Sequence, residues 1–333
     1  MRKINGVPVE AHTDLSNLTG GEVLKWDSTN TLMAWEDQDS TGYVPWAFQG
    51  SNYGFTAGGA TGSTNYSDII DRFAFTSNVT ATDWGDLSIG RSGCSGQSSS
   101  TDGFTSGGYR YGYQNYIDKF SFTSNTTASD HGDLSVSRNG SAGQSSSTHG
   151  FASGGYSSTT TIDKFSFSSN TTASDHGDLS VGRQGCTGQS STDYGFTSGG
   201  ETNNYIDKFT FSSNTTASDH GDLSLSRHSA AGQSSTTDGF TSGGAISGIY
   251  HDTMDKFSFS SNTTASDHGN LSQGRAGCSG QSQTDNGFTS GGYESGDVRV
   301  NTINKFTYSS NTTASDWGDL TSTRSSTSAG TQY

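Results

Sequence analysis

The segments GFTSGG at residues 103–108 and IDKFSFTSN at residues 117–125 decide the fold, because close copies of both recur from residue 53 onward. The glycine pairs that end the first motif follow one another at intervals of 49, 47, 45, 44 and 48 residues. A period of this length built from short strands is typical of a β-propeller, in which each repeat forms one four-stranded blade. The six pairs are Gly58-Gly59, Gly107-Gly108, Gly154-Gly155, Gly199-Gly200, Gly243-Gly244 and Gly291-Gly292.

Each repeat is predicted to hold four strands. In one copy they are GCSGQSSS (93–100), GFTSGG (103–108), IDKFSFTSN (117–125) and a strand within TTASDHGDLSVSR (126–138). The small residues of the first strand let six inner strands approach one another around a common axis. The glycines after the second strand adopt backbone conformations that other residues avoid.

Three aromatic positions recur in each repeat, one on the second strand and two on the third. Alternate residues of a strand share a face, so the two on the third strand lie on the same side. We expect the three rings to fill the gap between adjacent blades, each burying about 150–250 Å². The second-strand residues are Phe55, Phe104, Phe151, Phe196, Phe240 and Phe288. The third-strand pairs are Phe73/Phe75, Phe120/Phe122, Phe165/Phe167, Phe209/Phe211, Phe257/Phe259 and Phe306/Tyr308.

The two ends of the repeat region are predicted to join. The first repeat begins at a second strand, YGFTAGG (53–59), and the final residues RSSTSAGTQY (324–333) match the first-strand segment RNGSAGQSSS (138–147) with one extra residue. The C-terminal strand therefore completes the opening blade and removes an exposed sheet edge. The predicted fold is an all-β, six-bladed propeller over residues 43–333, closed by the C-terminal strand and preceded by a short attachment segment at 1–42.

Composition narrows the possible partners. The net charge of −15 disfavours binding to phosphate backbones, so no nucleic-acid partner is expected. No run of 18 apolar residues exists, so no membrane span is expected. The three cysteines lack CxxC spacing, which favours free thiols over a disulfide framework.

The repeat resembles the kelch family. In that family a Gly-Gly pair ends the second strand, an aromatic third strand follows, and a Trp and an Arg come further on. The Trp position is held by Trp84 and Trp317, whereas four histidines occupy it in the middle repeats: His131, His176, His220 and His268. The Arg position is held by Arg91, Arg138, Arg183, Arg227, Arg275 and Arg324, which we interpret as structural. The resemblance implies a propeller, and histidine in place of Trp departs from the family pattern.

Two sets of side chains suggest metal binding, and for each a structural interpretation is preferred. The recurring SDHGD motif brings Asp and His together, but Trp replaces His in TDWGD (82–86) and SDWGD (315–319), which favours packing of a planar ring. Cys94, Cys186 and Cys278 fall on the first strands of alternate blades. Three thiols around an axis could meet a soft metal, but small residues filling a tight position explain them better.

The glutamines of the first strand leave two alternatives open: they line a watery axial channel, or they form hydrogen bonds between blades. They are Gln97, Gln144, Gln189, Gln233 and Gln281. The sequence contains no nucleophile elbow, P-loop or dinucleotide fingerprint, and no blade carries its own cluster of titratable residues. We therefore expect a protein that is not an enzyme, with no catalytic residues, no cofactor and no metal.

The segments between the second and third strands vary most and carry nine of the 14 tyrosines. In a propeller these loops emerge on one face, and Tyr among Ser, Gly and Asn is the composition of adaptable binding surfaces. The structural alternative is that Tyr caps the strand ends. The candidate binding residues are Tyr66, Tyr109, Tyr111, Tyr113, Tyr116, Tyr156, Tyr205, Tyr250 and Tyr293.

The N-terminal segment contains no copy of the repeat. VLKWD (23–27) and LMAWED (32–37) are predicted to form a hairpin around the turn STNT. The surrounding stretch resembles a module of bacteriophage fibres and other virion proteins; the alternative is a hairpin packed on the propeller. The resemblance implies a virion location, attachment to other virion proteins through residues 1–42, and a propeller that displays a binding face for a host receptor or glycan. The alternatives are a virion decoration or assembly protein and a glycan-acting propeller enzyme.

Overall fold

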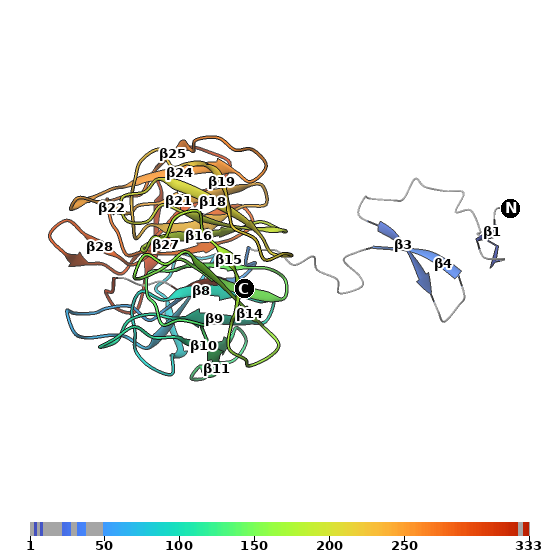
Figure 1. Cartoon of the computed structure of the whole chain (residues 1–333), viewed down its shortest axis with the longest axis horizontal. Coiled ribbons are helices and arrows are strands. Elements are labelled where there is room, and N and C mark those ends of the chain that lie inside the picture. Colours follow the sequence, from blue (N-terminus) through green and yellow to red (C-terminus); the bar gives the residue numbers. More distant parts are fainter. Residues whose placement is uncertain are drawn as a thin grey trace. The chain divides into compact units, whose positions relative to one another are not determined.

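The computed structural model describes residues 49–325 and 329–332, together with residues 3–4, 7–8, 22–27 and 32–37 as strands only. The chain divides into two units, residues 1–47 and 48–333 (Figure 1). The boundary predicted between residues 42 and 43 lies outside the described residues. All described elements are strands. No helix suited to crossing a membrane occurs in this part of the chain.

The larger unit consists of six four-stranded antiparallel sheets, as predicted. The inner strands are β8 (Ser95–Ser98), β12 (Ala142–Ser145), β16 (Thr187–Ser190), β20 (Ala231–Ser234), β26 (Ser279–Ser282) and β32 (Ala329–Gln332). The second strands are β5 (Tyr53–Ala57), β9 (Asp102–Ser106), β13 (His149–Ser153), β17 (Tyr194–Ser198), β21 (Asp238–Ser242) and β27 (Asn286–Ser290). The third strands are β6 (Ile69–Ala74), β10 (Tyr116–Ser121), β14 (Thr161–Ser166), β18 (Tyr205–Thr210), β24 (Thr253–Ser258) and β30 (Thr302–Thr307). The outer strands are β7 (Thr82–Asp86), β11 (Ser129–Asp133), β15 (Ser174–Asp178), β19 (Ser218–Asp222), β25 (Ser266–Asn270) and β31 (Ser315–Asp319).

Two of the loops between second and third strands form small hairpins of their own. They are β22 (Ala245–Ile246) with β23 (Ile249–Tyr250), and β28 (Tyr293–Glu294) with β29 (Val298–Arg299). Both project from the same side of the propeller in Figure 1. These hairpins were not predicted from the sequence.

The C-terminal strand closes the ring, which confirms the prediction. β32 pairs with β5, with Gly330 opposite Thr56 and Gln332 opposite Gly54. The inner strands also join one another: the Ser98 amide donates to Ser145 Oγ of the next blade at 3.0 Å. In the closing strand Gln332 takes the place that serine holds in the other inner strands. Its side-chain Oε1 accepts from the Ser282 backbone amide at 3.4 Å, and its backbone amide donates to Ser98 Oγ at 3.2 Å. The remaining links are Ser145 to Ser190, Ser190 to Ser234 and Ser234 to Ser282.

Glycine lets the inner strands approach this closely. A Cβ atom placed on Gly188 would lie 2.1 Å from the carbonyl oxygen of Gly143 in the preceding blade. The same conflict recurs at Gly143, Gly232, Gly280 and Gly330, at 1.9 to 2.3 Å. The predicted need for small residues around the axis is therefore confirmed.

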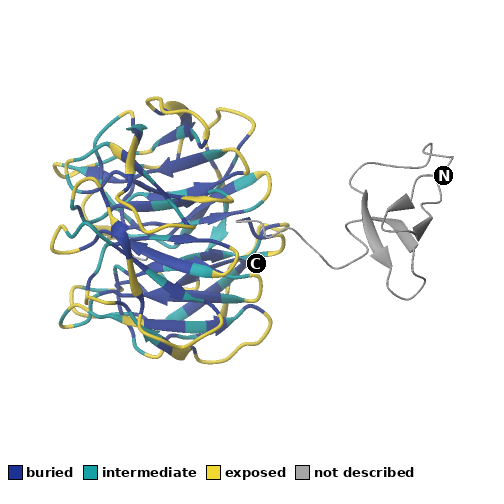
Figure 2. Ribbon diagram, turned by 45° about the vertical axis from the view of Figure 1, so that its right-hand side comes forward, coloured by how far each residue is buried: buried dark blue, intermediate teal, exposed yellow. Residues whose placement is uncertain are grey.

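Aromatic wedges fill the space between blades, as predicted. Phe104 stacks on Phe167 of the next blade with ring centroids 4.7 Å apart, and tilts against Phe165 at 5.7 Å. Ile117 and Leu134, from the same blade as Phe104, belong to the same cluster. Equivalent clusters occupy all six junctions, including the one between the last and first blades. Figure 2 shows the buried strands that carry them, with exposed residues concentrated in the loops.

The repeat arginines are structural, as interpreted from the sequence. Arg183 Nη1 lies 3.0 Å from Asp207 Oδ2, with both side chains at most 1% exposed, and its Nη2 donates to the Thr197 carbonyl. Four other buried pairs repeat this arrangement: Arg91–Asp118, Arg138–Asp163, Arg227–Asp255 and Arg324–Asp71. In the sixth blade Asn304 stands where the others have Asp, so Arg275 donates only to backbone carbonyls in the bonds described.

The smaller unit contains the predicted hairpin. β3 (Glu22–Asp27) pairs with β4 (Leu32–Asp37), with Glu22 opposite Asp37 and Asp27 opposite Leu32. A second short pair joins β1 (Lys3–Ile4) to β2 (Val7–Pro8). The turn expected at residues 28–31 lies outside the described residues.

Candidate functional site

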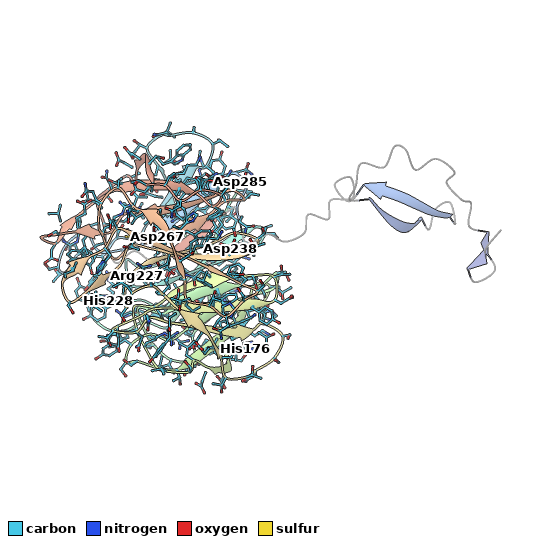
Figure 3. The ribbon with its side chains drawn as sticks, turned by 90° about the horizontal axis from the view of Figure 1, so that it is seen from above. His176, Arg227, His228, Asp238, Asp267 and Asp285 are labelled. Carbon is cyan, nitrogen blue, oxygen red and sulfur yellow. The ribbon has the colours of Figure 1, made fainter. Side chains whose placement is uncertain are left out.

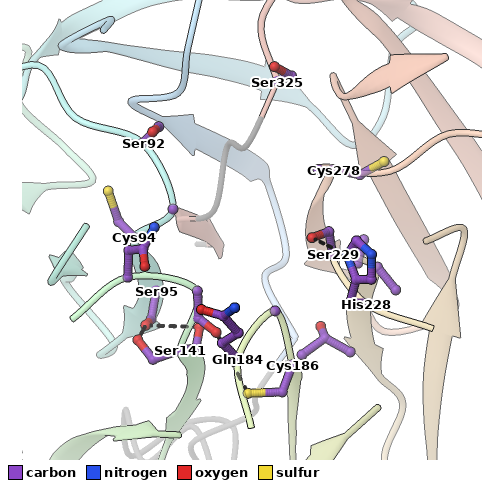
Figure 4. A pocket seen from close by; sticks show the side chains of 18 of the residues that line it. Ser92, Cys94, Ser95, Ser141, Gln184, Cys186, His228, Ser229, Cys278 and Ser325 are labelled. Atoms are coloured by element: carbon purple, nitrogen blue, oxygen red, sulfur yellow. Dashed lines mark hydrogen bonds between the residues drawn. The ribbon is translucent and has the colours of Figure 1, made fainter. Parts of the chain in front are cut away.

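An axial pocket of about 940 Å³ is lined by residues of all six blades. Its wall consists of the segments that lead into the inner strands, and Figure 4 shows their side chains around the cavity. Its rim includes residues of the loops between second and third strands, among them Tyr66, Tyr109 and Tyr250. The pocket therefore opens at the pole of the propeller where these loops lie.

The described lining ends part-way along the axis. The deepest lining residues of the inner strands are their glycines: Gly96, Gly143, Gly188, Gly232, Gly280 and Gly330. The next residues on the same face of these strands are buried, as Ser98 at 7% and Ser282 at 4% exposed illustrate. At the far ends of the inner strands, buried Gln49 donates to the Ser234 carbonyl at 3.1 Å and the Gly50 amide donates to the Ser282 carbonyl at 2.8 Å. The start of the described propeller chain thus occupies the pole opposite the pocket.

The inner-strand glutamines join the blades. Gln144 Nε2 donates to the Phe196 carbonyl of the next blade at 2.9 Å and contacts Ser153 Oγ of its own blade at the same distance. The other four make the equivalent bond to the next blade at 2.9 to 3.0 Å: Gln97, Gln189, Gln233 and Gln281. Of the two alternatives from the sequence, hydrogen bonding between blades is confirmed and lining of a channel is not.

The three cysteines lie on the pocket wall, but the contacts described for their thiols are with backbone. Cys186 Sγ lies 3.6 Å from the Ser153 carbonyl oxygen and 3.7 Å from that of Gly140. Burial raises the pKa of the Cys186 thiol, and raises that of Cys278 to about 11. In the described part of the chain, no group of three or more His, Cys, Asp or Glu side chains is arranged to hold a metal ion. The contacts support the interpretation of these thiols as small buried side chains.

The SDHGD histidines act as planar hydrogen-bonding rings between blades. His176 Nε2 lies 2.9 Å from the Thr210 carbonyl oxygen, and its ring packs on Phe151 at 5.0 Å. Trp84 makes the same connection, because its Nε1 donates to the Ser121 carbonyl at 2.9 Å. Burial lowers the pKa of His176, which favours the neutral ring. The shared bond explains why histidine and tryptophan alternate at this position, and confirms the packing interpretation.

The structure separates the nine candidate tyrosines into groups. Four line the pocket: Tyr66, Tyr109, Tyr250 and Tyr293. Tyr111, Tyr113 and Tyr156 extend the cluster of Tyr66 and Tyr109 across three blades, with Tyr113 and Tyr156 stacked at 4.2 Å between ring centroids. Tyr250 and Tyr293 form a separate edge-to-face pair at 5.3 Å. Tyr116 and Tyr205 begin third strands and fit the strand-capping alternative.

Charged residues of the rim were not predicted from the sequence. Glu201, His228, Asp297 and Arg299 all line the pocket. Tyr250 Oη donates to Asp297 Oδ1 across two blades at 2.9 Å, and burial together with this bond raises the pKa of Tyr250 to about 12. The sequence could have indicated His228, because the residue that follows each repeat arginine changes from blade to blade while the residues around it change little. The residues at this position are Ser92, Asn139, Gln184, His228, Ala276 and Ser325.

The rim loops also hold unusual backbone conformations. Asp297 has φ of 59° and Glu201 has φ of 49°, values that residues other than glycine seldom adopt. Tyr111, Ser158 and Ser247 share this left-handed region, so five of the six loops contain one such residue. Backbone strain of this kind is concentrated at functional sites in proteins.

Comparison with known proteins gave no relative from which a function could be transferred. No protein-family model matches the chain, and no curated protein matches it. The pocket and its rim therefore have to be interpreted from their own chemistry.

Proposed function

We propose that this chain is a bacteriophage virion protein, similar to a tail fibre, whose kelch-like propeller binds a glycan of the host surface through its tyrosine-bearing pole. Residues 1–42 attach it to other virion proteins. The propeller binds without catalysing a reaction and needs no cofactor.

The observation that carries the proposal is the separation of two poles. The pocket and the variable loops lie at one end of the axis, and Gln49 and Gly50 contact the far ends of the inner strands at the other. In Figure 3, His228 of the pocket wall lies on one side of the propeller and Asp238 and Asp285 lie on the other. The described propeller chain therefore begins at the pole opposite the pocket.

The chemistry of the rim supports a glycan as the ligand. Tyrosine presents a flat apolar face and a hydroxyl at low entropic cost, and ligand sites combine such rings with a few polar groups. Tyr250 and Tyr293 provide such rings on one side of the pocket, with Asp297 bonded to the first of them. The net charge of −15 disfavours a nucleic-acid ligand.

The test uses the purified full-length protein, fluorescently labelled, on a panel of bacteria and on their isolated surface polysaccharides. We expect binding to at least one strain, competition by its polysaccharide, and no change in the polysaccharide chain length. A fall in chain length would support the glycan-acting enzyme instead. Absence of binding to every strain and polysaccharide would reject host recognition and favour the decoration or assembly role.

A further inference from the structure

We infer that the axial pocket receives the uncharged end of a glycan chain, so that the protein recognises a chain terminus rather than an internal stretch. This inference rests on the proposed glycan-binding function and specifies what that site accepts. Three features of the pocket carry it: its depth, its charge and the distribution of its side chains.

The pocket opens at the pole where the variable loops lie. Its lining stops at the ring of inner-strand glycines, where each strand lies too close to its neighbour for even a Cβ atom. Beyond this ring the strands are joined by buried glutamines, and Gln49 lies at their far ends. A polymer can pass along a groove or through a channel, but only its end can enter a closed cavity. The volume of about 940 Å³ falls in the usual range for small-molecule sites, about 300–1,000 Å³.

The lining is polar and nearly balanced in charge. Its charged residues in the described chain are Glu201, Asp297 and Arg299, while burial lowers the pKa of His228 and favours its neutral ring. The walls also present hydroxyls, amides and backbone, such as Ser95 and the side chain of Gln184, beside the three thiols and several alanines (Figure 4). An anionic sugar would approach a protein of net charge −15, which is unfavourable. The balance favours a neutral sugar whose hydroxyls donate and accept.

One side of the pocket carries most of the specific groups. Tyr250 and Tyr293 supply aromatic faces from neighbouring hairpins, and Asp297 supplies an acceptor beside them. Arg299 also lines this side and supplies a positively charged donor there. We expect this side to bind the terminal sugar.

The test measures competition, using oligosaccharides released by partial acid hydrolysis from the surface polysaccharide of a bacterium that the protein binds. Hydrolysis multiplies chain ends at constant sugar mass. If termini are recognised, a tenfold rise in chain ends increases competing potency per unit mass about tenfold, and the active fraction passes an anion exchanger unretained. Constant or falling potency on hydrolysis, or activity confined to retained acidic fragments, would overturn the inference while leaving glycan binding intact.

Two variants locate the binding event. Gln184→Trp places a bulky ring in the pocket at a position where other blades hold Ser, Asn, His or Ala, so we expect it to fold. It should weaken binding to the same bacterium at least 100-fold. The control Tyr194→Ala alters an exposed tyrosine at the start of β17, outside the pocket lining and the variable loops, and should change binding less than twofold. Unchanged binding by folded Gln184→Trp would overturn the pocket assignment, and binding by neither the parent protein nor the variants would reject the proposed function itself.

Discussion

The strands of each blade and the loops at the pocket pole follow different constraints. A strand such as β17 is buried between the two neighbouring blades. Its burial pattern recurs, with little change, in the second strand of each blade. The loops range from a short turn after Gly200 to the full hairpin of β28 and β29. Contacts shared between repeats therefore fix the strand residues, while the loops are free to diverge. The difference shows that the contacts between blades determine the conserved part of each repeat, and that the loops are its variable part.

The largest effect is expected from opening the ring. Deleting residues 325–333 removes β32, leaves β5 as an exposed edge and interrupts the hydrogen-bonded circle at Ser98 and Ser282. With four paired residues lost, we expect the free energy of unfolding to fall by about 4 kcal/mol or more. Thermal unfolding followed by circular dichroism measures this, and an unchanged melting temperature would contradict a closed ring.

The buried ion pairs allow a matched exchange between blades. Asp118→Asn leaves Arg91 without its carboxylate and should destabilise by about 3–5 kcal/mol. Asn304→Asp makes the sixth blade like the others: it keeps the acceptor for Ser272 and removes a buried amide nitrogen that has no partner. We therefore expect a gain of about 1–3 kcal/mol. Chemical denaturation measures the free energy of unfolding of both variants. A loss of stability from Asn304→Asp as large as that from Asp118→Asn would show that the sixth blade does not accept the ion pair of the others.

A glycine substitution contrasts the ring with a loop directly. Gly188→Ala forces a Cβ to within 2.1 Å of a neighbouring backbone oxygen, whereas a Cβ at Gly112 meets nothing within 4 Å. We expect a loss of about 1–3 kcal/mol or more for the first and less than about 0.5 kcal/mol for the second. Similar melting temperatures for the two variants would mean that the inner strands lie further apart than described.

A smaller effect concerns pH and the histidines between blades. Burial holds the pKa of His176 and His220 below the ordinary 6.5, so below about pH 6.5 the unfolded chain binds more protons than the folded one. Their contribution to stability is therefore present above that pH and is lost as the pH falls toward the folded-state pKa. The double substitution His176→Trp/His220→Trp copies Trp84 and should flatten this part of the stability profile between about pH 7 and pH 5. An unchanged slope would assign the dependence to other groups.

The smallest effect on stability is expected at the loops. Tyr113→Ala and Tyr156→Ala remove rings that are 38% and 41% exposed and that stack on each other. We expect each to lower the free energy of unfolding by less than about 1 kcal/mol. Denaturation curves for the two single variants and the double variant measure both the loss and the coupling of the pair. A loss of stability as large as that caused by Asp118→Asn would mean that these two tyrosines hold the fold together.

The sequence was sufficient for the features that repeat. Blade number and the aromatic wedges follow from residues such as Phe104 and Phe165, whose equivalents recur every 44 to 49 residues, and closure follows from the match of the C-terminal segment to a first strand. The ion pairs were recoverable in principle, since an Asp equivalent to Asp118 precedes a basic residue and a phenylalanine on the third strand of every blade but the sixth, where Asn304 replaces it. Their partners remained hidden because the pairing of Arg91 with Asp118 depends on how two strands are placed in space.

The candidate site was predictable only in part. Tyrosines gathered in the variable loops, but their sequence did not reveal that Tyr250 and Tyr293 line the pocket while Tyr116 and Tyr205 do not. The loops differ in sequence from blade to blade, so the repeat gives no information on their conformation. That conformation depends on single residues such as Asp297, which lies in the left-handed region. The contact of Gln49 with the pole opposite the pocket could not be predicted either. Gln49 lies outside the repeat, and its hydrogen-bond partner is 185 positions away in the sequence.

Native-state hydrogen exchange, measured by mass spectrometry, reports on ring closure residue by residue. β32 pairs with β5 as the other inner strands pair with their second strands, while the loops lie outside these sheets. We predict that amides of residues 329–332 exchange as slowly as those of β8 and β12, and that residues 109–115 exchange much faster. Exchange of residues 329–332 at the rate of the loops would contradict the closed ring on which the pocket depends.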